Sequence, residues 1–303
     1  MAKKTKTNSK SDEQIEIAEI HANDVVTNIV GTSPMIMNRF SQKAWQELLY
    51  PSERRSRATL EQSLKHDPVA EFRGAVYRNR DPKQPALIHV PNGAFHGALA
   101  AAALDIPGAA KAKIERLTRV VDVNINLFGV PQIFCAMVRN SDMNRTPDVR
   151  TRPIYPRWAC TVTIRYIRNV LTERTIVNLL AAAGVIIGIG DWRGQKGGPY
   201  GAFRLVSDHD KEFLDIVKNG GRVAQQKALD TPIFFDEDTE ELLTWFAREV
   251  ERRERDLPSA QKPSTRKTII EKGNGKDGDG EYVGVEVSGT RRGKRRSSVQ
   301  ATA

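Results

Sequence analysis

Seven of the 22 glycines in this 303-residue chain lie in one short stretch, residues 184–206, which reads GVIIGIGDWRGQKGGPYGAFRLV. Glycine adopts positive φ and lets another backbone or a ligand approach closely. Two rings and two cations are interleaved with these glycines: Trp192, Arg193, Lys196 and Tyr200. Such a loop suits stacking on bases and pairing with phosphates. A connecting hairpin whose rings cover the edge of the core would have the same composition.

The charge of the chain is concentrated in its two ends. Of the net charge of +10, residues 1–13 carry +2 and residues 256–303 carry +4, which leaves +4 for the rest. Basic ends favour any polyanion without sequence preference. We predict disordered basic tails at 1–13 and 256–303 around a single domain at 14–255. A small apolar island, Tyr282–Val287, interrupts the second tail and is either a docking peptide or without a role.

Several classes of site are not indicated by the composition. The two cysteines, Cys135 and Cys160, lie in apolar strand-like runs and are interpreted as buried thiols of a reducing compartment. The five histidines show no metal-ligand spacing, and no apolar run approaches the length of a membrane span. The N-terminus has no signal-peptide core. We therefore expect a cytoplasmic protein with no metal, no small-molecule cofactor and no membrane partner.

The pattern of residues 86–206 predicts an alternation of strands and helices. The expected order is strand 86–90, helix 94–104, strands 119–126 and 132–139, a long loop, strand 158–167, helix 173–183, the glycine-rich turn and strand 202–206. Asp67 and Thr172 are expected helix caps. One or two strands are expected before Gly31, a helix from Ser41, and further helices from Ser207 and from Asp236.

The predicted long loop, residues 140–157, is the second unusual segment. It contains three prolines and four arginines, and its apolar residues follow no period. Loops of this length without structure of their own are uncommon and often functional. The arginines could equally be ordinary solvated charges. They are Arg145, Arg150, Arg152 and Arg157.

A helix followed directly by a glycine-rich loop and a last strand resembles the RAMP superfamily. The match is GIGDWRGQKGGPYGAFRL, which follows the predicted helix. RAMP proteins are ferredoxin-like, RRM-type folds that include backbone subunits of CRISPR effector complexes. In them, the corresponding glycine-rich loop helps to hold RNA. The resemblance implies an α+β fold: a ferredoxin-like antiparallel sheet with helices packed on one face, followed by C-terminal helices.

Three motifs are also similar to a group of uncharacterised tailed-phage and prophage proteins. They are GTSPMIMNRF at 31–40, PRWACTVTIRY at 156–166 and GIGDWRGQKGGPYGAF at 188–203. Their joint order is more specific than any one of them. Gly194 departs from the pattern, because that group often has proline there. Fold alone does not fix function, so this resemblance implies only a role in phage nucleic-acid metabolism.

Together, these observations predict a single-stranded nucleic-acid-binding protein, for RNA or DNA, that oligomerises along the strand. The expected phosphate contacts are Arg39, Arg145, Arg150, Arg152, Arg157, Arg193 and Lys196, and the expected stacking rings are Tyr155, Trp192 and Tyr200. The glycines expected to shape the loop are Gly188, Gly190, Gly194, Gly197, Gly198 and Gly201.

Two alternatives remain open at this level. The first is a phage structural or assembly protein whose basic tails merely neutralise polyanions. The second follows from the RAMP resemblance, because some members cut RNA with a loop aspartate, and Asp148 is the candidate for that role here. No catalytic motif of known spacing occurs in the chain, so we expect no enzymatic activity.

Overall fold

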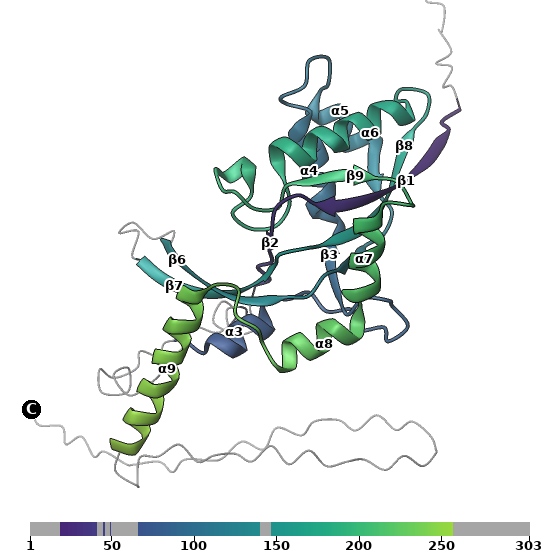
Figure 1. The fold of residues 1–303 in the computed structure, drawn as a ribbon. Coiled ribbons are helices and arrows are strands. Elements are labelled where there is room, and N and C mark those ends of the chain that lie inside the picture. Colours follow the sequence, from purple (N-terminus) through teal and green to yellow (C-terminus); the bar gives the residue numbers. More distant parts are fainter. Residues whose placement is uncertain (1–18, 41–44, 46–48, 50–65, 140–146, 257–303) are drawn as a thin grey trace, which may run out of the picture. The chain divides into compact units, whose positions relative to one another are not determined.

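The computed structural model describes residues 19–40, 45, 49, 66–139 and 147–256 (Figure 1). Contacts divide the chain into the units Met1–Arg253 and Glu254–Ala303. Residues 1–13, 257–303 and Arg145, and all but two residues of the helix expected from Ser41, lie outside the described residues. The domain boundaries predicted from the sequence therefore stay predictions.

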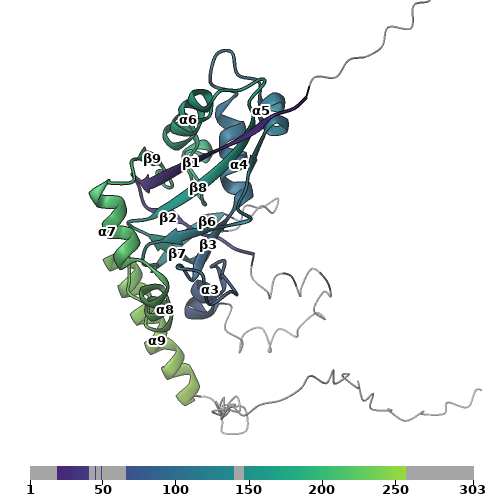
Figure 2. The ribbon, with the colours of Figure 1, turned by 90° about the vertical axis from the view of Figure 1, so that its right-hand side faces the viewer.

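One antiparallel sheet forms the centre of this unit. Its strands follow the order β3-β5-β8-β1-β9, and β4 also pairs with β8. Their bounds are β1 Ala22–Gly31, β3 Ile88–Pro91, β4 Thr118–Val120, β5 Asn124–Phe128, β8 Ala159–Ile167 and β9 Phe203–Val206. The longest pairing joins β1 to β8, which run side by side in Figure 2.

Alternation of side chains gives this sheet one fully apolar face. Val25 and Ile29 of β1 point into the main core, as do Val162 and Ile164 of β8. Helices α4 (Asn92–Ala102) and α6 (Glu173–Ala182) contact each other and pack on this face. The predicted cap of α6 is confirmed, because the Thr172 hydroxyl accepts the Thr175 N–H at 3.2 Å. Helix α5 (Lys111–Leu117) packs beside α4.

Among the described residues, the opposite face of the sheet is covered at one end. Helix α7 (Lys211–Asn219) buries Phe213 and Ile216 against Val30 and Ala159, which form a second apolar cluster. The expectation of helices on one face thus holds for α4 and α6, whereas a C-terminal helix occupies the other face. Two more helices follow, α8 (Arg222–Asp230) and α9 (Glu237–Asp256).

A separate three-stranded sheet corrects the prediction of a loop at 140–157. Residues 147–155 form β7 (Pro147–Tyr155), which pairs along its length with β6 (Gln132–Arg139) and at its end with β2 (Met35–Ile36). The prolines of this segment concealed its strand character, although the Pro153 carbonyl still accepts the Met37 N–H at 3.0 Å. Helix α3 (Pro68–Gly74), capped by Asp67 as predicted, packs against β7.

The two cysteines differ in their surroundings. Cys160 is fully buried, and burial raises the pKa of its thiol. Cys135 is half-buried rather than buried as expected, and burial also raises the pKa of this thiol. Within the described part of the chain, no helix combines the length and apolar character needed to cross a membrane.

Candidate nucleic-acid interface

The glycine-rich loop is folded tightly on itself and is therefore a fixed element. It follows α6 and the π-helical turn η1 (Ala183–Ile187), and it contains one 3-10 turn, η2 (Gly194–Lys196). The Ile189 N–H donates to the Gly201 carbonyl at 2.9 Å, and the Gly198 N–H donates to the Arg193 carbonyl at 3.1 Å. Four of its glycines have positive φ: Gly188, Gly190, Gly197 and Gly201.

Asp191 fastens this loop to the three-stranded sheet. Its backbone N–H donates to the Ile36 carbonyl of β2 at 2.8 Å. Its carboxylate accepts from the Arg152 guanidinium of β7 and from the Trp192 N–H. Arg152 was predicted to contact phosphate, but its side chain is mostly buried in this ion pair. The pair joins the loop to β7, so the segments 140–157 and 188–201, which we expected at one side of the sheet, are in contact here.

Trp192 holds its ring at the surface in an unusual backbone conformation. It has φ 50° and is the only non-glycine residue with positive φ within the described ranges. This left-handed conformation costs a non-glycine residue about 1–2 kcal/mol. The side chain is nonetheless 45% exposed. Strained residues of this kind concentrate at functional sites, and the strain here positions an indole ring next to solvent.

A ladder of four rings begins at Trp192. The centroid of the Trp192 ring lies 5.7 Å from that of the Tyr200 ring. The centroid of the Phe134 ring, on β6, lies 6.3 Å from that of Tyr200 and 5.6 Å from that of Phe235. We call these four residues the ring ladder. Arg152 lies directly across from Phe134 in the register of β6 and β7. The ladder therefore connects the loop to the three-stranded sheet, with cations close by.

The other side of the loop forms one wall of a groove with a volume of about 620 Å³. Opposite it, α4 presents only small side chains, and the floor is apolar. The residues of the α4 wall are Gly93, Ala94, Gly97, Ala98 and Ala101, and those of the floor include Met35, Met37, Tyr77 and Ile189. Small residues leave room for a flat group against the helix. The volume lies within the range of ligand pockets, roughly 300–1,000 Å³.

Polar groups line the rim of this groove. Arg193 and Gln195 come from the loop, where Gln195 Oε1 accepts from the Arg193 guanidinium at 2.7 Å. Asn38 and Lys111 also line the groove. Arg39 follows Asn38, and its guanidinium lies 6.0 Å from the centre of the Tyr77 ring. The rim thus offers hydrogen-bond donors around an apolar floor. Its positive charge is partly balanced by Asp191 and Glu115, which also line the groove, and Glu115 lies 3.8 Å from Lys111.

His89, near Arg39, does not add to that charge. Burial, and then the positive charge of Arg39, lower the pKa of the imidazole. It is therefore neutral at pH 7. Its Nδ1 atom has no hydrogen-bond partner among the described residues, and its ring packs against Tyr77.

Several predicted contacts do not reach this site. Tyr155 is fully buried, so the prediction that its ring stacks on bases is incompatible with the structure. Arg157 pairs with Asp215 of α7 at 2.9 Å, away from the loop. Arg150 pairs with Asp148 at 3.0 Å and remains half-exposed. Arg145 lies outside the described residues. Lys196 is exposed on the loop, as expected.

Asp148, the aspartate weighed for RNA cleavage, lies in a closed cluster. Its side chain is buried, and a carboxylate oxygen lies 3.0 Å from Nε2 of His66, whose Nδ1 lies 2.6 Å from Glu71 of α3. This cluster holds β7 against α3. Within the described ranges, no group of three His, Cys, Asp or Glu side chains is arranged to hold a metal ion.

Reasoning from the sequence missed the second half of the site. The residues Asn38 and Gln195 and the ring of Phe134 were not singled out, and the small side chains of α4 were not assigned to the site. The alternating glycines and alanines of α4 were a usable signal, because small residues repeated at helical spacing indicate a face that something approaches closely. Nothing local in the sequence marks Phe134, because tertiary packing alone brings it to Tyr200.

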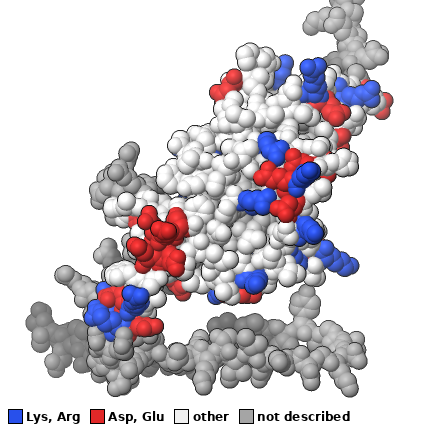
Figure 3. Space-filling model, in the orientation of Figure 1, with Lys and Arg blue, Asp and Glu red and all other residues white. Residues whose placement is uncertain are grey.

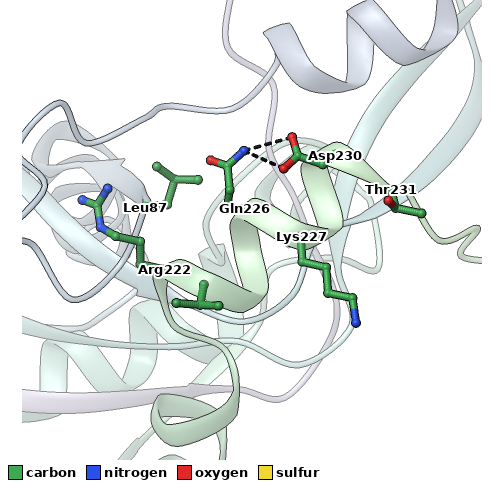
Figure 4. A pocket seen from close by; sticks show the side chains of 7 residues that line it. Leu87, Arg222, Gln226, Lys227, Asp230 and Thr231 are labelled. Atoms are coloured by element: carbon green, nitrogen blue, oxygen red, sulfur yellow. Dashed lines mark hydrogen bonds between the residues drawn. The ribbon is translucent and has the colours of Figure 1, made fainter. Parts of the chain in front are cut away.

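A second hollow, of about 630 Å³, lies beside α8 and is less suited to a ligand (Figure 4). Three of its polar side chains, Arg222, Gln226 and Asp230, are engaged within the protein. The Arg222 guanidinium donates to the Gln84 carbonyl at 2.9 Å, and the Gln226 amide donates to both carboxylate oxygens of Asp230 at 2.9 and 3.0 Å. No patch of positive charge alone marks a site on the face drawn in Figure 3, where Asp and Glu gather near the start of α9 and most Lys and Arg elsewhere lie close to Asp and Glu. The loop with its groove and ring ladder is therefore the candidate site.

Comparison with known proteins adds little to this geometry. No family model and no curated protein matches the chain. Among solved structures, a chain of the Type III-B Cmr-beta complex bound to cognate target RNA is similar at a TM-score of 0.35 and 12% identity, over 61% of this chain and 59% of that one. Cmr6 from Pyrococcus furiosus is similar at a TM-score of 0.28 and 11% identity, over 63% of this chain and 100% of that one. TM-scores this low do not define a shared fold, so the proposals below rest on the residues of this chain.

Proposed function

We propose that this protein binds single-stranded nucleic acid at the glycine-rich loop, without catalysis. The observation that carries the proposal is an exposed, strained Trp192 at the end of the ring ladder, between Asp191 and Arg193, which line the groove. Bases of a single strand are free to stack on such rings. The cations Arg39, Arg193 and Lys196 supply contacts for phosphates around the same loop.

The strand order supports a ferredoxin-like core. When β4 and β5 are counted together as one strand position, the spatial order is β9, β1, β8 and then β4 with β5. This is the order of a βαββαβ unit, in which α4 and α6 are the two crossover helices. The glycine-rich loop then lies between the second helix and the last strand. This is the position that the motif resemblance predicts, and the resemblance to phage proteins supports a role in phage nucleic-acid metabolism.

Binding through the open face of the sheet is less favoured. Away from α4 and α6, the β1–β8 pairs present Asp24 with Arg165, Val26 with Thr163 and Asn28 with Thr161. The Arg165 guanidinium donates to both carboxylate oxygens of Asp24 at 2.7 Å. These pairs contain no ring, so stacking on this part of the sheet is not available.

The proposal is tested by fluorescence anisotropy with labelled single- and double-stranded oligonucleotides over a salt series. We expect preferential binding of single strands that weakens steeply with salt, because the protein neutralises phosphates. Trp192→Ala should weaken binding by about tenfold, since a stacked base contributes about 1–3 kcal/mol. Trp192→Phe should retain most of the affinity.

Two exposed lysines show whether binding depends on the glycine-rich loop or on positive charge anywhere on the surface. Lys196→Gln on the loop should weaken binding, whereas Lys218→Gln on α7, which is also exposed, should not. Absence of binding at low salt would exclude the proposal. If the two lysine changes weaken binding equally and Trp192→Ala leaves the affinity unchanged, the result would instead favour an assembly protein whose charges neutralise polyanions.

A further inference from the structure

Helix α9 is fixed at its start and exposes apolar side chains further along. Asp236 Oδ1 accepts the Thr239 N–H at 2.8 Å, and the buried Thr239 hydroxyl accepts the Cys135 N–H of β6 at 3.2 Å. Leu243 packs against the main core. By contrast, Leu242 is 38% exposed and Trp245 is 59% exposed. A large apolar pair on the outer side of an anchored helix is a candidate docking surface.

Charges are arranged around Trp245 with opposite signs on its two sides. Asp238 and Glu241 precede it by seven and four positions, and Arg248 and Arg252 follow it by three and seven. At 3.6 residues per turn these five residues lie on one face of the helix. We call them the α9 stripe. Arg252 also donates to Glu249 at 2.8 Å on the helix surface.

The two halves of α9 carry different charge overall. Five acidic residues and no basic one occur at 236–241, whereas residues 248–253 contain three arginines and two glutamates. In Figure 3, acidic residues gather near the start of α9, and Lys and Arg appear further along it. A partner that matches this surface needs positive charge opposite the first half and apolar surface in the middle.

We propose that two copies of this chain associate through antiparallel contact of their α9 stripes. A two-fold axis near Trp245 places Asp238 and Glu241 of one copy opposite Arg252 and Arg248 of the other. The same contacts repeat on the other side of the axis, as a two-fold interface requires. Leu242 and Trp245 of both copies meet in the middle. The parallel arrangement sets the acidic halves against each other, so charge selects the antiparallel one.

The size of this contact predicts a weak dimer. The 17 residues from 237 to 253 span about 25 Å at 1.5 Å per residue. One helix of this length per copy buries less than the roughly 1,200 Å² of a stable interface. The dimer should therefore dissociate at low micromolar concentration and weaken as salt screens the stripe charges. This inference does not depend on nucleic-acid binding.

Sedimentation velocity of the full chain, freed of nucleic acid, tests the proposal over a range of concentration and salt. Two charge-reversed chains are compared with the wild type, Asp238→Lys/Glu241→Lys and Arg248→Glu/Arg252→Glu. Each alone places like charges opposite each other and should weaken dimerisation about tenfold or more. An equimolar mixture of the two restores complementarity and should form dimers about as well as the wild type.

Each outcome decides the proposal. A monomeric wild type at all concentrations, unchanged dimers in both variants, or a mixture no better than its components would overturn it. Circular dichroism checks that each variant keeps its fold. Should either be unfolded, Trp245→Gln replaces them, and a folded Trp245→Gln chain must dimerise more weakly for the proposal to stand. Association through another surface, or of a tail with this helix, would leave the mixture without a restoring effect.

Discussion

Gly197 and Gly201 both adopt positive φ in the glycine-rich loop, but their surroundings differ. A Cβ added to Gly201 would lie 1.8 Å from the Ile189 carbonyl oxygen, whereas nothing lies within 4 Å of one added to Gly197. Gly201 is required by close backbone contact as well as by its φ. Gly197 is required by its φ alone.

This difference predicts unequal costs for two identical substitutions. Gly197→Ala should destabilise the protein by about 1–2 kcal/mol through the left-handed conformation. Gly201→Ala should cost about 3 kcal/mol or more, because overpacking adds to the same strain. Urea unfolding of both variants measures the two costs. Equal losses would show that the contact with Ile189 relaxes without cost.

The cap of α7 makes a separate prediction about pH. The Phe213 N–H, and then Arg204, hold the pKa of Asp210 below its usual value. Because the folded pKa is depressed, the stabilisation is complete above about pH 4 and is lost as pH falls through the folded pKa. Asp210→Asn should therefore be less stable than wild type at pH 7, and the difference should shrink as pH falls through the folded pKa of Asp210. Thermal unfolding at several pH values measures this, and a constant difference would contradict it.

At the scale of elements, the Arg152–Asp191 pair joins the loop to β7 and should be coupled energetically. Removal of either partner leaves the other half-buried without its counter-charge, so Arg152→Ala and Asp191→Ala should each cost about 1–3 kcal/mol. The double variant should cost less than the sum, with a coupling of about 1 kcal/mol in a double-mutant cycle. The exposed Asp24–Arg165 pair is the control and should show a smaller coupling. Additive costs at residues 152 and 191 would mean that the pair does not hold the loop.

Elements with local signals are the ones that the sequence predicts well. The caps Asp67 and Thr172, the period-two pattern of β8 and the helix before the loop all have causes within a few residues. The strand β7 was missed because Pro147 and Pro153 suggest a loop. Only its pairing with β6 and β2, which are distant in sequence, makes it a strand.

In the candidate site too, features with a local sequence signal were predicted, and features that depend on contacts distant in sequence were not. The loop, its glycines and Trp192 are visible in the sequence, because they form one dense segment. The α4 wall and Phe134 lie some 90 and 60 residues before the loop and are brought to it by the sheet topology. Tyr155 was misjudged because its place on β7, which turns it into the core, follows from pairing rather than from its neighbours.

At the scale of the whole molecule, charge in the second tail should act on all polyanions alike. Replacement of the five cations at 291–296 by glutamine should weaken binding of single and double strands by a similar factor. It should also lower the salt dependence, by up to about 0.7 in the logarithmic slope for each phosphate of a single strand that the tail no longer neutralises. The preference for single strands should remain. Loss of that preference in anisotropy titrations would place the specific site in the tail.

The position of β1 between β8 and β9 has a consequence for synthesis of the chain. Both partners of this early strand are encoded far downstream, at 159–167 and 203–206. At 5–20 residues per second, β1 leaves the ribosome about 10–30 seconds before its second edge is covered. Until β8 has been made, its apolar residues have no native strand to pair with. β1 therefore reaches its native place in the sheet only after most of the chain has been made.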